Sequence, residues 1–459
     1  MFGRIKRIHF VGIGGIGMSG IAELLHNMGY IITGSDIKES ENTRRLQELG
    51  IEIHLSHSKD NLGDADVVVY TSAVNPKDNV ELNEANMRKI PVIPRAEMLA
   101  ELMRMKFSIA VAGSHGKSTT TSLIGSILQE SRYDPTIILG GRLKSSGDNA
   151  RLGKSEYLVA EADESDRSFL KLFPTIAVIT NIDRDHLDIY RDLDDIKQTF
   201  LKFANSVPFY GSVYLLMDDP NSLSIRSDIE KRVITYGLSP NADVKGLNVR
   251  REGFTYWFDL VANGDKLGSI KLNLPGIHNV TNAVAACGVC LELGIRFDQI
   301  KKGIEKCSGV SRRFERKGFE NGILVVDDYA HHPREIESTL KAARDGWDGR
   351  IIAIFQPHLY SRTILLKKEF GKAFFQADKV IITDIYPARE EPIPGVTGEI
   401  IKDQCRDFGH KDVEYIEDKE KIPEFLIPQL KERDMVILLG AGNIYTLAED
   451  ILEGIKDKR

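Results

Sequence analysis

The residues best suited to chemistry lie in one short loop, where a lysine and several hydroxyl side chains follow closely spaced glycines. An apolar run at 109–112 leads into this loop, and a helix-like run follows it. The loop residues are Gly113, Ser114, His115, Gly116, Lys117, Ser118 and Thr119. In such a loop, backbone N–H groups and the helix N-terminus face phosphates, the lysine reaches the β and γ oxygens, and the first hydroxyl ligates Mg²⁺. The loop therefore predicts binding of ATP or GTP.

This phosphate loop is two residues tighter than the common Walker pattern. Val111 stands where that pattern has its outer glycine. The alternative is a chance turn of glycine and serine. The order of strand, loop and helix favours phosphate binding.

A second glycine loop follows the first strand of the chain. Its glycines are Gly12, Gly14, Gly15 and Gly17, and Asp36 ends the next strand. This spacing places a diphosphate at a helix N-terminus and an acid beside a ribose. Taken alone, the motif predicts a nicotinamide dehydrogenase. Glycines that only allow a strand and a helix to pack closely are the structural alternative.

Acidic and histidine side chains follow two further strands. Glu161, Asp163, Glu164 and Asp166 come after the strand at 157–160, and His186 lies among aspartates after the strand at 175–180. Strand ends of a parallel sheet form its ligand-binding edge, and carboxylate oxygens suit Mg²⁺. A solvated acidic turn and a structural histidine are the alternatives.

Polar residues also mark a helix start and three strand ends later in the chain. His278, Asn279 and Asn282 could stack on and bond a base, although an N-cap by Asn279 is equally natural. The three strand ends carry residues 327–333, 355–363 and 384–390, which we expect to form one edge of a site.

Bulk composition limits the classes of function. The chain has 459 residues, which predicts two to four domains, and a net charge of −6, which argues against nonspecific nucleic-acid binding. No apolar run approaches the length of a membrane span. Four cysteines without disulfide spacing predict a reducing compartment. Cys287 and Cys290 fall in a helical pattern and are predicted to be buried thiols.

The order of predicted elements indicates an α/β protein of three domains. Residues 1–105 predict a Rossmann-like parallel sheet. Residues 106–312 predict a central P-loop ATPase α/β domain, with an antiparallel segment from 242 to 274 that turns at Asn263 and Gly264. Residues 313–459 predict a Rossmann-like C-terminal domain, with strands at 323–326, 351–355, 380–383 and 435–439.

Together, in order, these motifs resemble the Mur ligases, which build the peptide stem of bacterial peptidoglycan. The resemblance covers essentially the whole chain, and the first glycine loop is most similar to that of the alanine-adding branch. It implies ATP-dependent ligation of L-alanine to the carboxylate of UDP-N-acetylmuramate through an acyl phosphate, the first peptide step of cytoplasmic precursor synthesis. A recycling ligase that adds a tripeptide is the alternative within the family. A nucleotide-dependent sensor without turnover is the non-enzyme alternative.

The resemblance also implies residue roles. Lys117, Glu161, His186 and His331 would be catalytic, and Ser118, Glu161 and His186 would hold Mg²⁺, with Mn²⁺ as a substitute. ATP would contact the phosphate loop together with His278, Asn279, Asn282, Arg313 and Asp328. The amino acid would lie near Tyr329, His331 and Arg362. The UDP-sugar would contact Gly12, Gly14, Gly15, Gly17, Asp36, Ser72 and Arg95, in place of NAD.

One position departs from the family pattern. Leu359 stands where many members have arginine, so Arg362 would do more of the work of holding the amino-acid carboxylate. The resemblance implies no nucleic-acid or membrane partner, and a monomer or homodimer.

Overall fold

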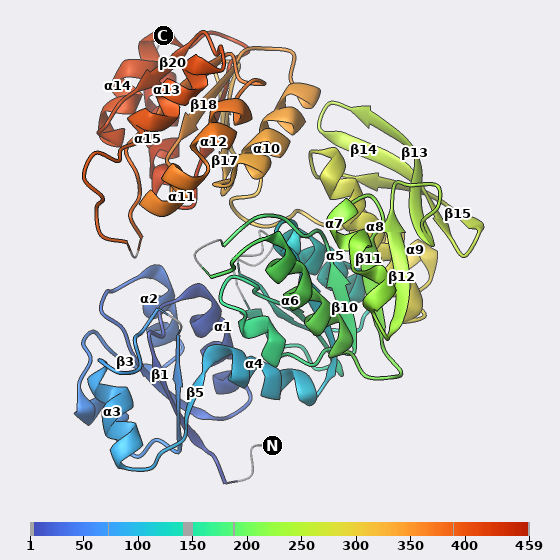
Figure 1. The fold of residues 1–459 in the computed structure, drawn as a ribbon, viewed down its shortest axis with the longest axis vertical. Helices are drawn as coiled ribbons and strands as arrows, with labels where there is room; N and C mark the ends of the chain where they lie inside the picture. The colour runs from blue at the N-terminus through green and yellow to red at the C-terminus, as the bar shows by residue number, and fades with distance from the viewer. Residues whose placement is uncertain (1–3, 72, 141–149, 187–188, 389, 458–459) are drawn as a thin grey trace. The chain divides into compact units, whose positions relative to one another are not determined.

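The computed structural model describes residues 4–71, 73–140, 150–186, 189–388 and 390–457 (Figure 1). The chain divides into two compact units. Unit 1 comprises Met1–Asn248, Phe258–Ile270 and Thr281–Gly309. Unit 2 comprises Val249–Trp257, Lys271–Val280 and Val310–Arg459.

The first sheet has the strand order β3-β2-β1-β4-β5, and every pair in it is parallel. The order reverses at β1, so the loop after β1 lies at the edge where such sheets bind ligands. The strands are β1 (Arg7–Val11), β2 (Ile31–Ser35), β3 (Glu52–His54), β4 (Val67–Tyr70) and β5 (Val92–Pro94). The helices are α1 (Ile16–Asn27), α2 (Glu41–Glu48), η1 (Lys59–Leu62), α3 (Val80–Met87) and α4 (Arg95–Arg104).

The central sheet is mixed and has the order β15-β14-β13-β12-β11-β10-β6-β9-β7-β8. Its middle is parallel, and β7 pairs with β8 in the antiparallel sense. The strands are β6 (Phe107–Ala112), β7 (Thr136–Ile138), β8 (Ala150–Arg151), β9 (Tyr157–Glu161), β10 (Ile176–Ile179), β11 (Ser212–Leu216), β12 (Arg232–Gly237), β13 (Val244–Glu252), β14 (Thr255–Ala262) and β15 (Asp265–Leu272). The helices are α5 (Lys117–Glu130), η2 (Ser168–Lys171), α6 (Leu193–Asn205), α7 (Pro220–Ser224), η3 (Arg226–Asp228), α8 (Ile277–Glu292) and α9 (Phe297–Lys306).

The predicted antiparallel segment is present at the β15 edge. Asn263 and Gly264 join β14 to β15 with φ angles of 53° and 88°. Two successive positive φ angles are typical of the tight hairpin turn that links antiparallel neighbours. The sequence did not reveal β13, the strand next to this hairpin.

The third sheet has the order β16-β17-β21-β18-β19-β20, and only its edge strand β16 pairs in the antiparallel sense. The strands are β16 (Glu315–Glu320), β17 (Ile323–Asp328), β18 (Ile351–Phe355), β19 (Lys379–Ile382), β20 (Val413–Tyr415) and β21 (Met435–Leu439). The helices are α10 (Pro333–Gly346), α11 (Tyr360–Leu365), α12 (Lys367–Ala373), α13 (Glu399–Asp407), η4 (Lys419–Lys421), α14 (Ile422–Leu426), η5 (Ile427–Gln429), η6 (Ile444–Thr446) and α15 (Leu447–Asp457). The predicted three-domain α/β architecture, with parallel outer sheets and a mixed central sheet, is confirmed.

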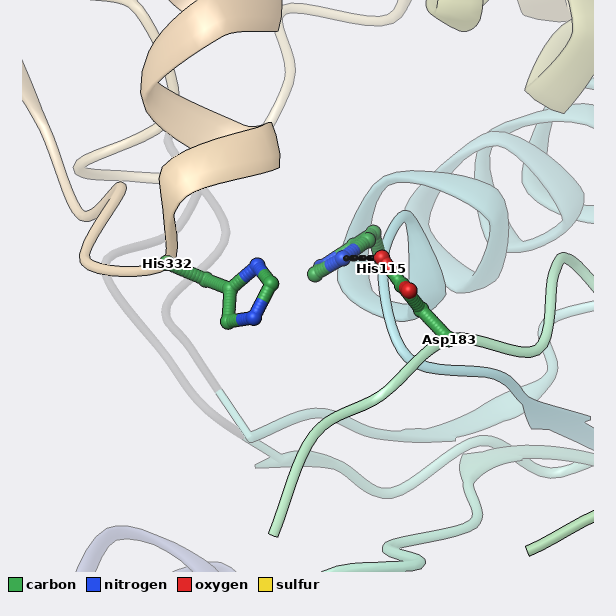
Figure 2. Close-up of side chains that lie close together, drawn as sticks. All are labelled: His115, Asp183 and His332. Atoms are coloured by element: carbon green, nitrogen blue, oxygen red, sulfur yellow. Dashed lines mark ion pairs between the residues drawn. The ribbon is translucent and has the colours of Figure 1, made fainter. Parts of the chain in front are cut away.

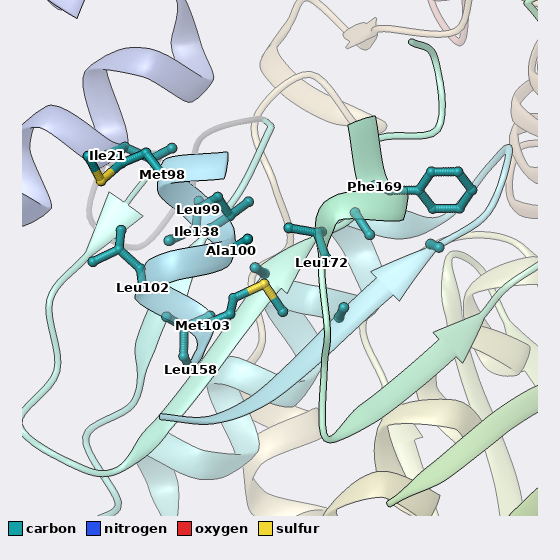
Figure 3. Packing of buried hydrophobic residues seen from close by; sticks show 14 of the residues in the cluster. Ile21, Met98, Leu99, Ala100, Leu102, Met103, Ile138, Leu158, Phe169 and Leu172 are labelled. Carbon is teal, nitrogen blue, oxygen red and sulfur yellow. The ribbon is translucent and has the colours of Figure 1, made fainter. Parts of the chain in front are cut away.

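Apolar packing in unit 1 is continuous from the first sheet into the central one. Figure 3 shows Ile21 of α1 beside Met98 of α4, and Leu102 and Met103 of α4 beside Leu158 of β9. All of these side chains are buried. Burial of apolar area is the main stabilising term in folding, so this cluster helps to hold α1 and α4 against the central domain.

Two smaller predictions can be checked in the fold. Cys287 and Cys290 lie in α8 as fully buried thiols, and burial raises the pKa of both well above the ordinary value. In the part of the chain that the structure describes, no helix has the length and apolar character needed to span a membrane.

Candidate functional site

The phosphate loop connects β6 directly to α5. Gly113 and Gly116 have φ angles of 139° and 85°, which residues with a side chain rarely adopt. A Cβ on Gly113 would collide with the Thr180 hydroxyl, and a Cβ on Gly116 would lie 2.8 Å from Oδ1 of Asn282. Gly116 precedes α5 without any side-chain cap, so the helix N-terminus stays open to an anion.

The strand end after β10 holds this loop in shape. Asn181 accepts a bond from Ser114 N on its carbonyl (3.1 Å) and one from His115 N on its side-chain oxygen (2.9 Å). Its amide and the Thr180 hydroxyl both donate to the carbonyl of His115, at 3.0 and 2.6 Å. Asp183 Oδ2 lies 3.5 Å from Nε2 of His115 (Figure 2). These bonds fix the shape of the phosphate loop.

Lys117 is turned back onto its own loop. Its Nζ donates to the carbonyl of Gly113 at 2.6 Å and to Oε1 of Glu164 at 2.8 Å, and lies 3.4 Å from the carbonyl of Ser114. Burial alone would lower the pKa of Lys117, but the carboxylates of Glu164 and Asp163 outweigh it and raise the pKa. Lys117 is therefore positively charged at neutral pH.

The predicted acidic and histidine residues gather beside this lysine. Glu161 ends β9, which pairs with β6 so that Glu161 stands opposite Val111. A Cβ on Gly140 would lie 2.9 Å from Oε2 of Glu161, so backbone closely flanks that carboxylate. His186 places its Nε2 3.7 Å from Oε1 of Glu164 and 3.6 Å from Oδ2 of Asp185. The structure thus brings Lys117, Glu164 and His186 together, and Ser118 lies in the first turn of α5.

The first glycine loop is held by the predicted acid and approached by the predicted arginine. Oδ2 of Asp36 accepts a bond from Gly14 N at 2.8 Å. A Cβ on Gly17 would lie 3.1 Å from Nη1 of Arg95. Gly12 follows β1, and Gly15 precedes α1 without a side-chain cap. Ser72, the remaining predicted contact, lies outside the described residues.

Arg95 also reaches the acidic strand end. Its Nη2 lies 3.7 Å from Oδ2 of Asp163. This ion pair connects the arginine beside the first glycine loop to the acidic strand end near Lys117. The sequence did not predict this link, because the two residues are far apart along the chain.

The three predicted adenine contacts share helix α8. Asn282 lies against the phosphate loop, next to Gly116. Asn279 is the third residue of the helix, and its amide donates to the carbonyl of Pro275 at 2.6 Å. The alternative that Asn279 caps the helix is wrong. His278 lies next to Gly276 in the turn before it.

In unit 2, Glu335 connects several predicted residues. It accepts a bond from Nη1 of Arg313 at 3.2 Å and one from the backbone N–H of His331 at 3.1 Å. Cζ of Arg313 lies 5.4 Å from the centre of the Tyr329 ring. Asp328 uses both oxygens on backbone N–H groups, from Phe314 at 2.7 Å and Ala330 at 2.8 Å. Asp328 therefore fixes the loop that carries Arg313.

A row of rings leads from Tyr329 to Arg362. The Tyr329 and His331 rings lie 5.3 Å apart, and the His331 and His358 rings lie 5.7 Å apart. Nη1 of Arg362 is 3.3 Å from Nδ1 of His358. Leu359 precedes this arginine with a φ of 72°, an uncommon value for a branched side chain. The structure thus brings the predicted amino-acid residues Tyr329, His331 and Arg362 into one cluster, with His358 between them.

Some residues at these sites were not singled out from the sequence. Glu164 was expected only as one of several acids at a strand end, and Asn181, Arg312 and Glu335 were given no role. Arg312 packs between the rings of Tyr329 and Tyr445, at 5.0 and 4.5 Å. For Glu335 a signal existed: an acid at the third helical position after a proline start is typical of a capping residue.

Comparison with known proteins supports the family resemblance over most of the chain. Residues 7–107 match the Mur ligase family, catalytic domain; residues 111–290 match the Mur ligase middle domain; and residues 312–442 match the Mur ligase, glutamate ligase domain. The chain is 55% identical over 457 residues to UDP-N-acetylmuramate--L-alanine ligase of Geotalea daltonii, covering 100% of both chains. It is 52% identical to the enzyme of the same name from Salinibacter ruber, covering 98% of this chain and 95% of that one.

Solved structures show the same architecture. The UDP-N-acetylmuramate-alanine ligase of Thermotoga maritima is 30% identical, with a TM-score of 0.83 over 99% of this chain and 100% of that one. A murein peptide ligase from Psychrobacter arcticus shares the fold at 22% identity, with a TM-score of 0.72 over 98% of this chain and 99% of that one. With identity above 50% to full-length curated relatives and three matching family domains, the chain belongs to the Mur ligase family.

Proposed function

We propose that this chain joins L-alanine to the carboxylate of UDP-N-acetylmuramate using ATP, the first peptide step of cytoplasmic peptidoglycan precursor synthesis. The names of full-length relatives at 52–55% identity support this substrate set. The observation that carries the chemistry is the charged, partly buried Lys117 in a glycine loop at an uncapped helix N-terminus. Such a loop suits phosphoryl transfer from a nucleoside triphosphate.

The proposed reaction has two transfers. The terminal phosphoryl group of ATP passes to an oxygen of the substrate carboxylate, which gives an acyl phosphate and ADP. The alanine amine then attacks the acyl carbon, phosphate leaves as the amide forms, and the amine gives up its proton. Such transfers depend mainly on positioning and charge neutralisation. Lys117 is placed to neutralise charge on the transferred group and the carboxylate.

The donor atoms near Lys117 fit a divalent cation. Ser118 offers a hydroxyl, Glu161 a carboxylate beside the loop and His186 an imidazole, and we assign these three as the ligands. The oxygen donors suit both Mg²⁺ and Mn²⁺. When bound, the ion would neutralise phosphate charge.

We assign the sugar nucleotide to residues 1–105, ATP to 106–312 and the amino acid to 313–459. The uncapped start of α1 beside Gly14 suits a diphosphate, and Arg95 adds a positive charge there. In unit 2, the guanidinium of Arg362 suits a bidentate pair with the alanine carboxylate, and Tyr329 and His331 lie in the same cluster.

Phosphate release with defined substrates tests this function. The purified protein is incubated with ATP, Mg²⁺ and UDP-N-acetylmuramate, together with either L-alanine or the stem tripeptide. We expect release with L-alanine and formation of the amide product by mass spectrometry. Release only with the tripeptide would instead assign the recycling reaction, and nucleotide binding without substrate-dependent release would indicate a sensor.

A further inference from the structure

Glu164 forms a hydrogen-bonded ion pair with Lys117, the lysine expected to bind the phosphates of ATP. All three protons of the Lys117 ammonium face groups of the protein: Oε1 of Glu164 at 2.8 Å and the carbonyls of Gly113 and Ser114 at 2.6 and 3.4 Å. The Glu164 side chain is only 3% exposed, and that of Lys117 only 18%. A phosphate group could accept hydrogen bonds from all of these protons only after Glu164 has released the hydrogen bond that it accepts from Lys117.

Hydrogen bonds hold the backbone of Glu164 in place, whereas its carboxylate is only partly hydrogen-bonded. Its carbonyl accepts bonds from the Tyr190 hydroxyl at 2.5 Å and from Arg167 N at 3.1 Å. Among the residues that the structure describes, no group hydrogen-bonds to its second carboxylate oxygen, Oε2, although that atom is buried. The turn is therefore fixed, while the carboxylate is held at one oxygen by Lys117 at 2.8 Å, with Nε2 of His186 3.7 Å from that oxygen.

Two anions cannot share one ammonium at hydrogen-bond distance without repelling each other in a buried site. A phosphate-loop lysine donates to the β and γ oxygens of a bound nucleotide. Burial raises the pKa of Glu164, and the Lys117 ammonium opposes that rise by favouring the ionised form. The ionised carboxylate has the charge and the hydrogen-bonding pattern of part of a phosphoryl group, and it binds the same protons.

We propose that Glu164 is a positioning residue that stands in for the terminal phosphate of ATP. Its carboxylate holds Lys117 in the loop, and ATP binding requires that Lys117 be released from it. This inference rests on the proposed function, because it requires that the loop binds ATP. It implies that Glu164 opposes ATP binding, and that it opposes ADP less, because ADP lacks the phosphate that Glu164 replaces.

The test compares nucleotide affinities of the full-length protein by titration calorimetry. Wild type, Glu164→Gln and Glu164→Asp are titrated with a nonhydrolysable ATP analogue and with ADP, each with Mg²⁺. Glutamine keeps the shape without the charge, and aspartate keeps the charge one methylene short of Lys117. Asp166→Asn is the control, because it removes one negative charge from the same turn and keeps its oxygen for the bond from Ser168 N.

We expect Glu164→Gln to bind the ATP analogue at least fivefold more tightly, with less than a twofold change for ADP. Glu164→Asp should shift in the same direction, and Asp166→Asn should match wild type. Weaker or unchanged binding of the analogue in the Glu164 variants would overturn the proposal, as would equal tightening in Asp166→Asn. If Glu164→Gln does not fold, the aspartate variant decides alone.

Failure of the proposed function would give results different from those that overturn the role of Glu164. Wild type that binds no nucleotide removes both proposals. Wild type that binds the analogue but releases no phosphate with L-alanine removes the proposed reaction and leaves the role of Glu164 to the calorimetry.

Discussion

At the scale of single residues, Lys117 carries the most specific expectation. Lys117→Ala removes the positive charge from the phosphate loop, so we expect kcat to fall by about 10²–10³-fold or more, in the range seen when one transition-state donor is lost. Binding of UDP-N-acetylmuramate should stay within about twofold of wild type, because the first glycine loop contacts other residues. Steady-state kinetics and calorimetry measure the two effects.

The control for this variant is Lys171→Ala, which removes a half-exposed lysine of the same domain that pairs with Glu97. It should leave both quantities unchanged. Simultaneous loss of ATP-dependent turnover and of sugar-nucleotide binding in Lys117→Ala would contradict separate sites for the two ligands.

A second residue, Glu81, makes stability depend on pH. Burial alone would raise the pKa of this fully buried carboxyl, but contacts from His9, Ser35 and Asn61 outweigh it and lower the pKa to about 2. Because the folded-state pKa lies below the ordinary value of 4.5, the contribution to stability is present above about pH 4.5. It is lost as pH falls from there towards 2. The shift corresponds to about 3 kcal/mol.

Glu81→Gln should therefore unfold more easily than wild type at neutral pH, and the difference should shrink as pH falls through 4.5. Urea unfolding at several pH values measures it. Glu84→Gln, on the same helix and paired with Arg88 near the surface, should show no such convergence. A constant difference between Glu81→Gln and wild type from pH 7 to pH 3 would show that the charge of Glu81 is not what stabilises the fold.

The residue types at the site were largely readable from the sequence, because loops that bind phosphates need glycine, lysine and hydroxyls at fixed spacing. The interaction partners of these residues could not be predicted from the sequence. Glu164 bonds to a lysine 47 positions earlier, and Asp163 pairs with Arg95 across two sheets. Such pairs depend on which strand lies next to which, and a single sequence does not state strand order.

At the scale of elements, α9 holds the helix that follows the phosphate loop. Gly303 of α9 packs on α5, where a Cβ would lie 2.5 Å from Cα of Ile127, and Ser126 Oγ donates to the carbonyl of Gly303 at 2.7 Å. Replacing glycine by alanine inside a helix usually stabilises it by about 1 kcal/mol. Here the added methyl meets backbone, so we expect Gly303→Ala to destabilise the protein by about 1–3 kcal/mol.

Chemical denaturation measures this change, with Lys302→Ala, at an exposed neighbour on α9, as the control. The control should leave the free energy of unfolding within about 0.5 kcal/mol of wild type. A more stable Gly303→Ala variant would mean that α9 moves away from α5 at little cost, and that it does not hold the loop helix in place.

The buried strands β1, β6, β10 and β18 were predicted within a few residues, because they are short apolar runs bounded by turns. Two strands, β13 and β16, were missed. β13 and β16 carry several charged side chains, and each lies where one face remains partly exposed. Their place in a sheet comes from pairing with neighbours, which apolar periodicity does not report.

At the scale of the whole molecule, the proposed function divides three ligands among three stretches of chain, and the boundaries 1–105, 106–312 and 313–459 stay predictions. A variant in the last stretch tests the division. Arg362→Ala removes the guanidinium assigned to the alanine carboxylate. Charged hydrogen bonds contribute about 1.5–3 kcal/mol, so KM for L-alanine should rise about 10–100-fold.

The same variant should bind the ATP analogue and UDP-N-acetylmuramate as wild type does, since neither ligand is assigned to residues 313–459 alone. Lys367→Ala removes one positive charge from an exposed position nearby and should leave all three constants unchanged. If only the KM for L-alanine rises, amino-acid binding can be weakened without affecting the binding of ATP or of UDP-N-acetylmuramate. An equal loss for UDP-N-acetylmuramate would place Arg362 at the sugar substrate, and would move the amino-acid carboxylate to other residues of the row from Tyr329 to His358.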